Sequence, residues 1–144
     1  MNDAYVFDAE ALVAFLYSGP GHQYVESLLD DAASDGAEGY LSELTASEVY
    51  YLVARFEGED GTPTPESLRA ADRDVRALTR RSVALARADW RLAGEIKAHG
   101  DISLADAHAV ALAHERKATL VGGDDDFDTL PVGIDIDRFR DHAV

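Results

Sequence analysis

The stretch AYVFDAEALVAFL at residues 4–16 decides the fold class of the chain. Residues 4–7 form a short apolar run that ends at Asp8, and apolar side chains then recur at the three- and four-residue spacing of a helix. The sequence SGPG at residues 18–21 ends this pattern, because glycine and proline interrupt helices. The stretch therefore predicts a buried strand, an acidic residue at its carboxyl end and then an amphipathic helix.

Short strands and helices alternate along the rest of the chain. The other expected elements are a helix at residues 22–33, a strand at 40–41, a helix opening at the capping-box sequence TASE (45–48), helices at 66–80 and 90–98, a helix opening at SLAD (103–106), and strands at 119–121 and 134–136. Strands that alternate with helices favour a parallel sheet. The sequence therefore predicts an α/β fold of three layers, in which helices cover both faces of a sheet of about four to five short strands.

Composition indicates a single domain at residues 1–144 with a strongly acidic surface. A chain of 144 residues that is 47% hydrophobic can bury one core, and the absence of cysteine excludes disulfides and thiolate ligands. The 28 acidic residues outnumber the 13 Lys and Arg, giving a formal charge of −15 that repels nucleic acid and anionic lipid at long range. The acids are mostly Asp and the bases mostly Arg, a pattern typical of a halophile, whose molar salt screens charges beyond about 3 Å.

The sequence also predicts a cytoplasmic protein. Charged residues interrupt every apolar stretch within a few positions, so we expect no membrane-spanning helix. The first residues, Met1-Asn2-Asp3, carry no basic leader, so we expect no signal peptide.

Four acidic residues stand where the expected strands end or the expected helices begin: Asp8, Glu48, Asp106 and Asp124. In an open parallel sheet, residues beyond the carboxyl ends of the strands meet at one crevice. Crowded carboxylates raise one another's pKa, and a hard divalent cation such as Mg²⁺ or Mn²⁺ relieves this repulsion. Each acid taken alone could be a helix cap or a loop residue, but together they predict a metal site.

Four sequence blocks resemble the PIN domain, the nuclease fold of VapC-type toxins. The blocks are YVFD (5–8), TASEV (45–49), ISLADA (102–107) and LVGGDDDF (120–127), of which the last two are the most specific. The resemblance implies that Asp8, Glu48, Asp106 and Asp124 form the acidic quartet of the family, with Asp126 as an auxiliary metal ligand. One position departs from the pattern, because Gly122 stands where a hydroxyl residue is usual.

The resemblance implies a metal-dependent endoribonuclease. The acidic quartet would hold one or two Mg²⁺ or Mn²⁺ ions that activate a water for attack on an RNA phosphodiester, leaving 5′-phosphate and 3′-hydroxyl ends. It also implies a toxin that forms homodimers and is held inactive by a small antitoxin protein lying over the acidic crevice. The alternative is a PIN-like domain that binds RNA or protein without turnover. Gly122 favours that alternative, whereas the presence of all four acids favours the enzyme.

Two other site types fit parts of the same sequence. Asp124, Asp126 and Asp128 match the first ligand positions of a calcium-binding EF-hand loop, but Thr129 stands where that loop needs glycine. A haloacid-dehalogenase-like phosphatase would need a second Asp where the chain has Glu10. Both interpretations are weaker than the acidic quartet.

Arginines are concentrated in one expected helix. Arg69, Arg73, Arg76 and Arg80 share one helical face, which makes them candidates for binding RNA phosphates. Alternatively, they form ion pairs with acids of the same helix, such as Asp72 and Asp74. Downstream, Trp90 is expected to be an anchor in the core or in an interface rather than a platform for a base.

Overall fold

The computed structural model of the chain describes residues 3–123, 127 and 129–144. These residues form a five-stranded, fully parallel sheet in the order β3-β2-β1-β4-β5. The strands are β1 (Asp3–Phe7), β2 (Ala37–Ser42), β3 (Ala84–Ala86), β4 (Thr119–Gly122) and β5 (Ile136–Arg138). Because every strand runs in the same direction, all five carboxyl ends lie along one edge of the sheet. The α/β fold class expected from the sequence is confirmed.

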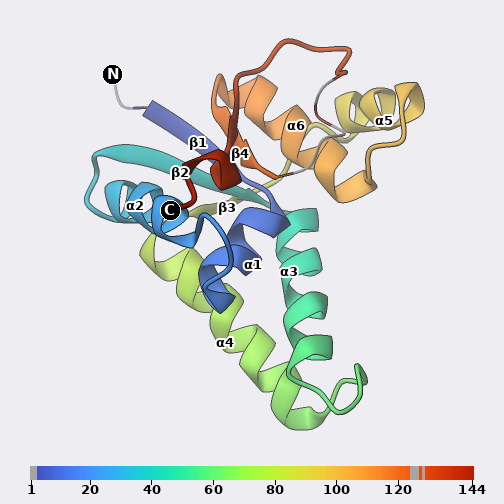
Figure 1. Cartoon of the computed structure of the whole chain (residues 1–144). Helices are drawn as coiled ribbons and strands as arrows, with labels where there is room; N and C mark the ends of the chain where they lie inside the picture. Colours follow the sequence, from blue (N-terminus) through green and yellow to red (C-terminus); the bar gives the residue numbers. More distant parts are fainter. Residues whose placement is uncertain (1–2, 124–126, 128) are drawn as a thin grey trace.

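Helices cover both faces of the sheet, giving three layers (Figure 1). One face carries α1 (Ala9–Tyr17), α2 (His22–Ala33), α3 (Glu43–Phe56) and α4 (Pro65–Arg81), and the other carries α5 (Trp90–His99) and α6 (Leu104–Arg116). Neighbouring strand residues alternate between the two cores, so Phe7 packs with α1 to α4 while Val6 packs with α6. The crossovers change face between β1 and β4, which is where ligands bind in open parallel sheets.

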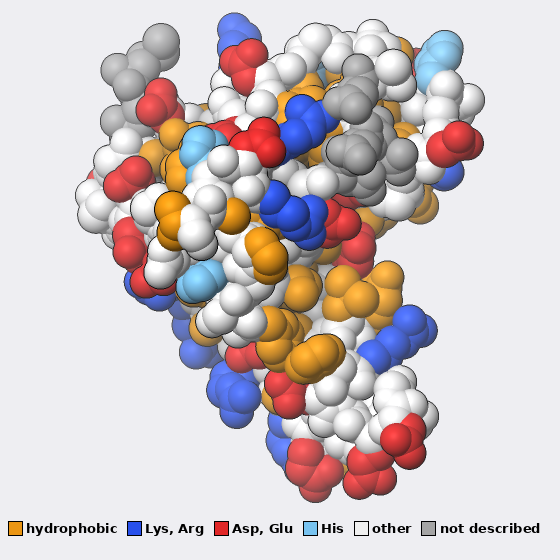
Figure 2. All heavy atoms as spheres, viewed as in Figure 1, with side chains coloured by type: hydrophobic (Ala, Val, Ile, Leu, Met, Phe, Trp, Pro, Cys, Tyr) orange, Lys and Arg blue, Asp and Glu red, His pale blue; other side chains and the backbone are white. Residues whose placement is uncertain are grey.

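Helices α3 and α4 form an antiparallel arm that extends away from the sheet (Figure 1). The loop at residues 57–64 joins them at the tip of the arm, where Glu59 and Thr62 pair across a tight turn. Thr64 caps α4 through the backbone N–H of Ser67. Acidic side chains gather at this tip in Figure 2, so the end of the arm remote from the sheet is strongly negative.

Helix α6 packs on the sheet through small side chains. Its buried residues include four alanines at alternate positions: Ala107, Ala109, Ala111 and Ala113. Each is fully shielded from solvent, which lets the helix backbone approach β1 and β2 closely. The first turn of this helix holds Asp106, so the alanines also position a candidate site residue.

The boundaries of three elements differ from the expectation. Helix α3 begins at Glu43 with Ser42 as its N-cap, so the capping box predicted at Thr45 is wrong and Glu48 lies in the second turn. Strand β3, with only three residues, was not expected because Ala-Leu-Ala has no alternating pattern. The last strand begins at Ile136 rather than Ile134, because Leu120 pairs with Ile136 in the register of β4 and β5.

Trp90 does not lie in the core, which was one of the two positions expected for it as an anchor; an interface remains the other. It is the first residue of α5, and 73% of its surface is exposed. The buried residues of α5 are Ala93 and Ile96 instead. Among the parts of the chain that the structure describes, no helix combines the length and the apolar character needed to cross a membrane.

Candidate active site

Asp8 lies at the carboxyl end of β1, the central strand of the sheet, and is 1% exposed. Its backbone N–H bonds to the carbonyl of Val121 on β4. The Oδ1 atom caps α1 by accepting a hydrogen bond from the backbone N–H of Ala11 at 2.7 Å. The Oδ2 atom accepts from the backbone N–H of Gly123 at 3.2 Å. Asp8 is thus both a helix cap and a buried acid at the switch point of the sheet.

Burial raises the pKa of the Asp8 carboxyl to about 8. The hydrogen bond from Ala11 opposes this shift, whereas the negative charges of Asp106 and Glu10 add to it. With no cation beside it, the carboxyl of Asp8 is therefore largely protonated at neutral pH. A nearby cation would favour the carboxylate form.

Asp106 and Glu48 come from two helices on opposite faces of the sheet. Asp106 lies in the first turn of α6, where its backbone N–H donates to the capping Ser103 Oγ at 3.1 Å, and the side chain is partly buried. Glu48 is also partly buried, and its pKa is raised by burial and by the charge of Glu10. Asp106 thus acts on the pKa of Asp8, and the charge of Glu10 acts on the pKa values of both Asp8 and Glu48.

Two of the five predicted metal ligands, Asp124 and Asp126, lie outside the described residues, as does Asp128 of the EF-hand alternative. Within residues 3–123, 127 and 129–144, no three Asp, Glu or His side chains are close enough to form a metal centre by themselves. The available donors are nevertheless carboxylate oxygens, the ligands preferred by Mg²⁺ and Mn²⁺. One of them, Asp8, is held buried beside another acid. The donor chemistry fits a hard divalent cation.

The sequence did not identify Arg140 as a site residue, nor did it show that Glu10 forms an ion pair with it. Arg140 follows β5 in the 3₁₀ helix η2 (Phe139–His142), and its Nη1 atom donates to Glu10 Oε2 at 3.0 Å and to the carbonyl of Gly123 at 3.1 Å. Figure 2 shows basic and acidic side chains side by side in this part of the surface. Correct placement of β5 would have put Arg140 at the carboxyl edge of the sheet, because it comes two residues after that strand.

Gly122 has no room for the hydroxyl side chain that is usual at its position. A Cβ atom there would lie 2.8 Å from Asp8 Oδ2 and 2.7 Å from Phe127 Cε2. The backbone N–H of Gly123 already donates to Asp8 Oδ2. In this chain a backbone group therefore supplies a hydrogen bond to the carboxyl beside Gly122.

The four predicted RNA-binding arginines lie exposed on α4, within the arm. Arg76 Nε binds both carboxylate oxygens of Asp72, at 3.0 and 2.9 Å. Arg69 lies 3.5 Å from Glu66, and Arg73 lies 3.8 Å from Asp74. These three arginines thus form ion pairs with acids of their own helix, which is the alternative to RNA binding that the sequence left open. Arg80 lies on the same helix at its C-terminal end.

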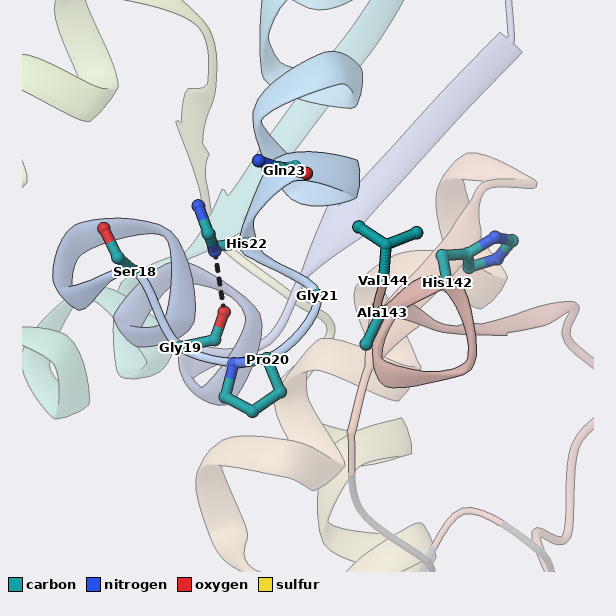
Figure 3. Close-up of a pocket in the computed structure, with 9 residues that line it drawn as sticks. All are labelled: Ser18, Gly19, Pro20, Gly21, His22, Gln23, His142, Ala143 and Val144. Atoms are coloured by element: carbon teal, nitrogen blue, oxygen red, sulfur yellow. Dashed lines mark hydrogen bonds between the residues drawn. The ribbon is translucent and has the colours of Figure 1, made fainter.

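Two hollows border the turn between α1 and α2. One of about 290 Å³ lies between residues 18–23 and the chain end at residues 142–144, where His22 Nδ1 donates to the carbonyl of Gly19 at 2.9 Å (Figure 3). None of the candidate site acids lines it. The other, of about 270 Å³, runs between α1 and α3, with apolar residues such as Val13 and Leu52 on its walls. Glu10 and Arg140 also line it, so this second groove opens onto the site.

The sequence pattern of the PIN domain matches residues 5–132. This match covers most of the chain, including every acid of the quartet. The chain belongs to the PIN domain family. Comparison with curated proteins finds no match.

Solved structures of VapBC and VapC proteins have the same fold. DNA-bound VapBC from Salmonella typhimurium superposes with a TM-score of 0.67 at 15% identity, covering 96% of this chain and 99% of that chain. VapBC2 from Rickettsia felis, bound to a promoter DNA fragment, gives 0.66 at 15% identity, with coverage of 93% and 97%. VapC20 of Mycobacterium tuberculosis, a toxin that cleaves the sarcin-ricin loop, gives 0.61 at 18% identity, with coverage of 86% and 92%.

Proposed function

We propose that the chain is a metal-dependent endoribonuclease and the toxin of a VapBC-type toxin–antitoxin pair. The observation that supports this most directly is the state of Asp8, a carboxyl 1% exposed at the switch point of a parallel sheet. Its pKa is raised first by burial and further by Asp106. A buried ionised acid next to another acid destabilises a fold unless a cation or a proton neutralises it, and such perturbed carboxyls cluster at functional sites.

Asp8, Glu48, Asp106 and Asp124 would hold Mg²⁺ or Mn²⁺, with Asp126 as an auxiliary ligand. The bound cation supplies the charge that activates a water and stabilises the leaving oxygen in hydrolysis of a phosphodiester. The chain itself fixes the ligands. Ala11 and Gly123 orient the two oxygens of Asp8 through their backbone N–H groups, and Ser103 fixes the helix start that carries Asp106.

The proposal is tested by incubating the purified protein with RNA in Mg²⁺ or Mn²⁺ and in EDTA. We expect metal-dependent cleavage with 5′-phosphate and 3′-hydroxyl ends. The second candidate function is binding of RNA or protein without turnover, which the absence of the usual hydroxyl residue at Gly122 favours. Retained RNA binding without cleavage in any metal would support that second function and contradict the first.

The partner would be a small antitoxin that binds across the groove between α1 and α3. Apolar side chains are exposed over this region in Figure 2. Phe56, 71% exposed, packs against Tyr17 with the two rings tilted and their centroids 4.5 Å apart, and Tyr17 also lines the groove. An antitoxin segment in this groove would reach Glu10 and Arg140. We further propose that the protein is a cytoplasmic homodimer, a state that light scattering of the purified chain measures.

A further inference from the structure

Trp90 is exposed to solvent and borders a surface hollow, which is a position typical of a ligand-binding residue. Trp90 is the only tryptophan in the sequence, and 73% of its surface is exposed. It borders a hollow of about 190 Å³, the Trp90 hollow, which is also lined by Glu43, Leu44, Arg87, Ala88 and His108. Pockets for drug-sized ligands measure roughly 300–1,000 Å³, so this hollow suits a smaller group.

The Trp90 hollow lies at the same edge of the sheet as the candidate active site. Glu43 directly follows β2 and Arg87 directly follows β3, so both come from carboxyl ends of parallel strands. Leu44 precedes Glu48 by one helical turn on the same face of α3, a rise of about 6 Å. His108 follows Asp106 by two residues on α6. Along α3, the hollow and Glu48 are therefore separated by about one helical turn.

The chemistry of the lining suits a nucleobase. Trp90 offers a flat aromatic surface on which any base can stack. Arg87 is 84% exposed and lies 3.4 Å from Glu43, so a cation and a hydrogen-bond acceptor stand together at the rim. His108 Nδ1 is held by the carbonyl of Leu104 at 2.9 Å, which fixes the direction of the ring. Stacking and hydrogen bonding to an unpaired base are thus both available.

The lining of the Trp90 hollow favours a base over a second protein copy as the occupant, because it combines an aromatic ring with a cation and with hydrogen-bonding side chains. A formal charge of −15 weakens the attraction of the chain to RNA phosphates. Contacts that do not depend on phosphate charge are therefore a favourable source of RNA affinity for an acidic protein. Base stacking is such a contact, and it contributes roughly 1–3 kcal/mol per base.

We propose that the Trp90 hollow binds an unpaired base of RNA beside the phosphate that is cleaved, with Trp90 as the stacking residue. This proposal rests on the proposed ribonuclease function, because that function places the RNA at the candidate active site. It adds a subsite that contributes to the choice of the phosphodiester that is cleaved. Its occupant is a nucleobase in a single-stranded segment, because a base in a duplex has no free face for stacking.

Binding is tested in EDTA, so that no RNA is cleaved, with a single-stranded RNA oligonucleotide as the probe. Since Trp90 is the only tryptophan, fluorescence excited at wavelengths that tyrosine does not absorb reports on this site alone. We expect saturable quenching by the oligonucleotide and much weaker quenching by the same sequence in a perfect duplex. Quenching that is equal for the single strand and the duplex would contradict a stacked base.

Substitutions separate stacking from general apolar contact. Affinity measured by anisotropy of labelled RNA should fall roughly 5- to 150-fold in Trp90→Ala and in Trp90→Leu, and should largely persist in Trp90→Phe. The salt dependence of binding should stay as in the parent. Leu85→Ala is the matched control, because Leu85 is 52% exposed on neighbouring β3 but does not line the hollow; it should bind as the parent does.

Two results would overturn the inference. Unchanged RNA affinity in Trp90→Ala and Trp90→Leu would remove the subsite, while cleavage by the parent would leave the proposed function intact. Loss of a dimer in Trp90→Ala, with RNA affinity per protomer retained, would assign the surface to a second copy. Conversely, Trp90-dependent binding by a parent that cleaves no RNA would support the subsite and contradict only the ribonuclease function.

Discussion

Arg140 Nη1 lies 3.0 Å from Glu10 Oε2 and 3.1 Å from the carbonyl oxygen of Gly123, so one guanidinium joins α1, β4 and η2 beside Asp8. Both paired side chains are almost half exposed, and such pairs contribute only about 0–1 kcal/mol to stability. The pair therefore matters more for the pKa values of the neighbouring acids than for the stability of the fold. The charge of Glu10 raises the pKa of Asp8 and of Glu48, and Arg140 is the cation paired with Glu10.

The first prediction concerns these pKa values in metal-free protein. Glu10→Gln removes a negative charge and should lower the pKa of Asp8 below its value of about 8. Arg140→Ala leaves Glu10 without its nearby cation and should raise the pKa of Asp8. Carboxyl ¹³C NMR titrations measure both shifts. Glu26→Gln is the control, since Glu26 is exposed on α2; one common titration midpoint for Asp8 in all four proteins would contradict the assignment.

The second prediction concerns catalysis. Asp8→Asn and Asp106→Asn should each reduce RNA cleavage roughly a hundredfold or more, because each removes a charged ligand from a preorganised site. Circular dichroism should show that both variants remain folded. Asp101→Asn changes an exposed acid just before α6 and should cleave like the parent. Cleavage at the parent rate by either site variant would refute the proposed metal site.

The third prediction concerns stability and pH. The pKa of Asp8 is higher in the folded protein than in the unfolded chain, so the folded state binds the proton more tightly and gains stability as the pH falls from about 8 toward 4. In EDTA the parent should therefore be more stable to urea at pH 6 than at pH 8, by at most about 1.4 kcal/mol per pH unit from this group.

Asp8→Asn supplies the comparison for this pH dependence, because it lacks the titrating carboxyl and keeps the histidines. It should lose less stability between pH 6 and pH 8, and at pH 8 in EDTA it should melt above the parent. Mn²⁺ should raise the melting temperature of the parent more than that of Asp8→Asn, since a cation that binds only the folded state stabilises it. Equal metal-induced shifts in both proteins would place the ion elsewhere on the acidic surface.

The fourth prediction compares two glycines by the same substitution. Gly122→Ala should destabilise the protein by roughly 1–3 kcal/mol and reduce cleavage, because the added methyl meets Asp8 Oδ2 and the Phe127 ring. Gly94→Ala, where a Cβ meets nothing within 4 Å inside α5, should stabilise it by up to about 1 kcal/mol. Urea denaturation measures both changes. A neutral Gly122→Ala would show that the neighbourhood of Asp8 adapts freely.

The fifth prediction concerns the arginines of α4. Arg73→Ala and Arg76→Ala should weaken RNA binding and should each reduce its salt dependence by about one counterion. Stability should change little, because the ion pairs of both residues are exposed. Binding titrations at several KCl concentrations, alongside melts, measure both effects. An unchanged salt dependence of binding would show that these arginines do not contact RNA phosphates and serve only in their ion pairs with Asp74 and Asp72.

The sequence was sufficient to predict the parallel sheet and the positions of Asp8 at a strand end and Asp106 at a helix start, because both residues lie at changes of hydrophobic period. It failed where the signal was short or nonlocal. Strand β3 has three residues and no alternation. The capping role of Ser42 was hidden by Thr45, which offers the same hydroxyl chemistry three residues later. Arg140 reaches Glu10 across 130 positions, and no local pattern encodes such a contact.

The alternate alanines of α6 give the core of this protein control over its chemistry. Ala107 and Ala111 lie on one side of the helix and Ala109 and Ala113 on the other, so together these small side chains set how closely α6 packs on its neighbours and thereby position Asp106 relative to Asp8. A single added methylene at one of these buried positions would shift the helix, and with it the Asp106 carboxylate, without touching either acid. In the proposed metal site, the preference for a smaller or larger cation would therefore depend in part on buried residues that never contact the ion.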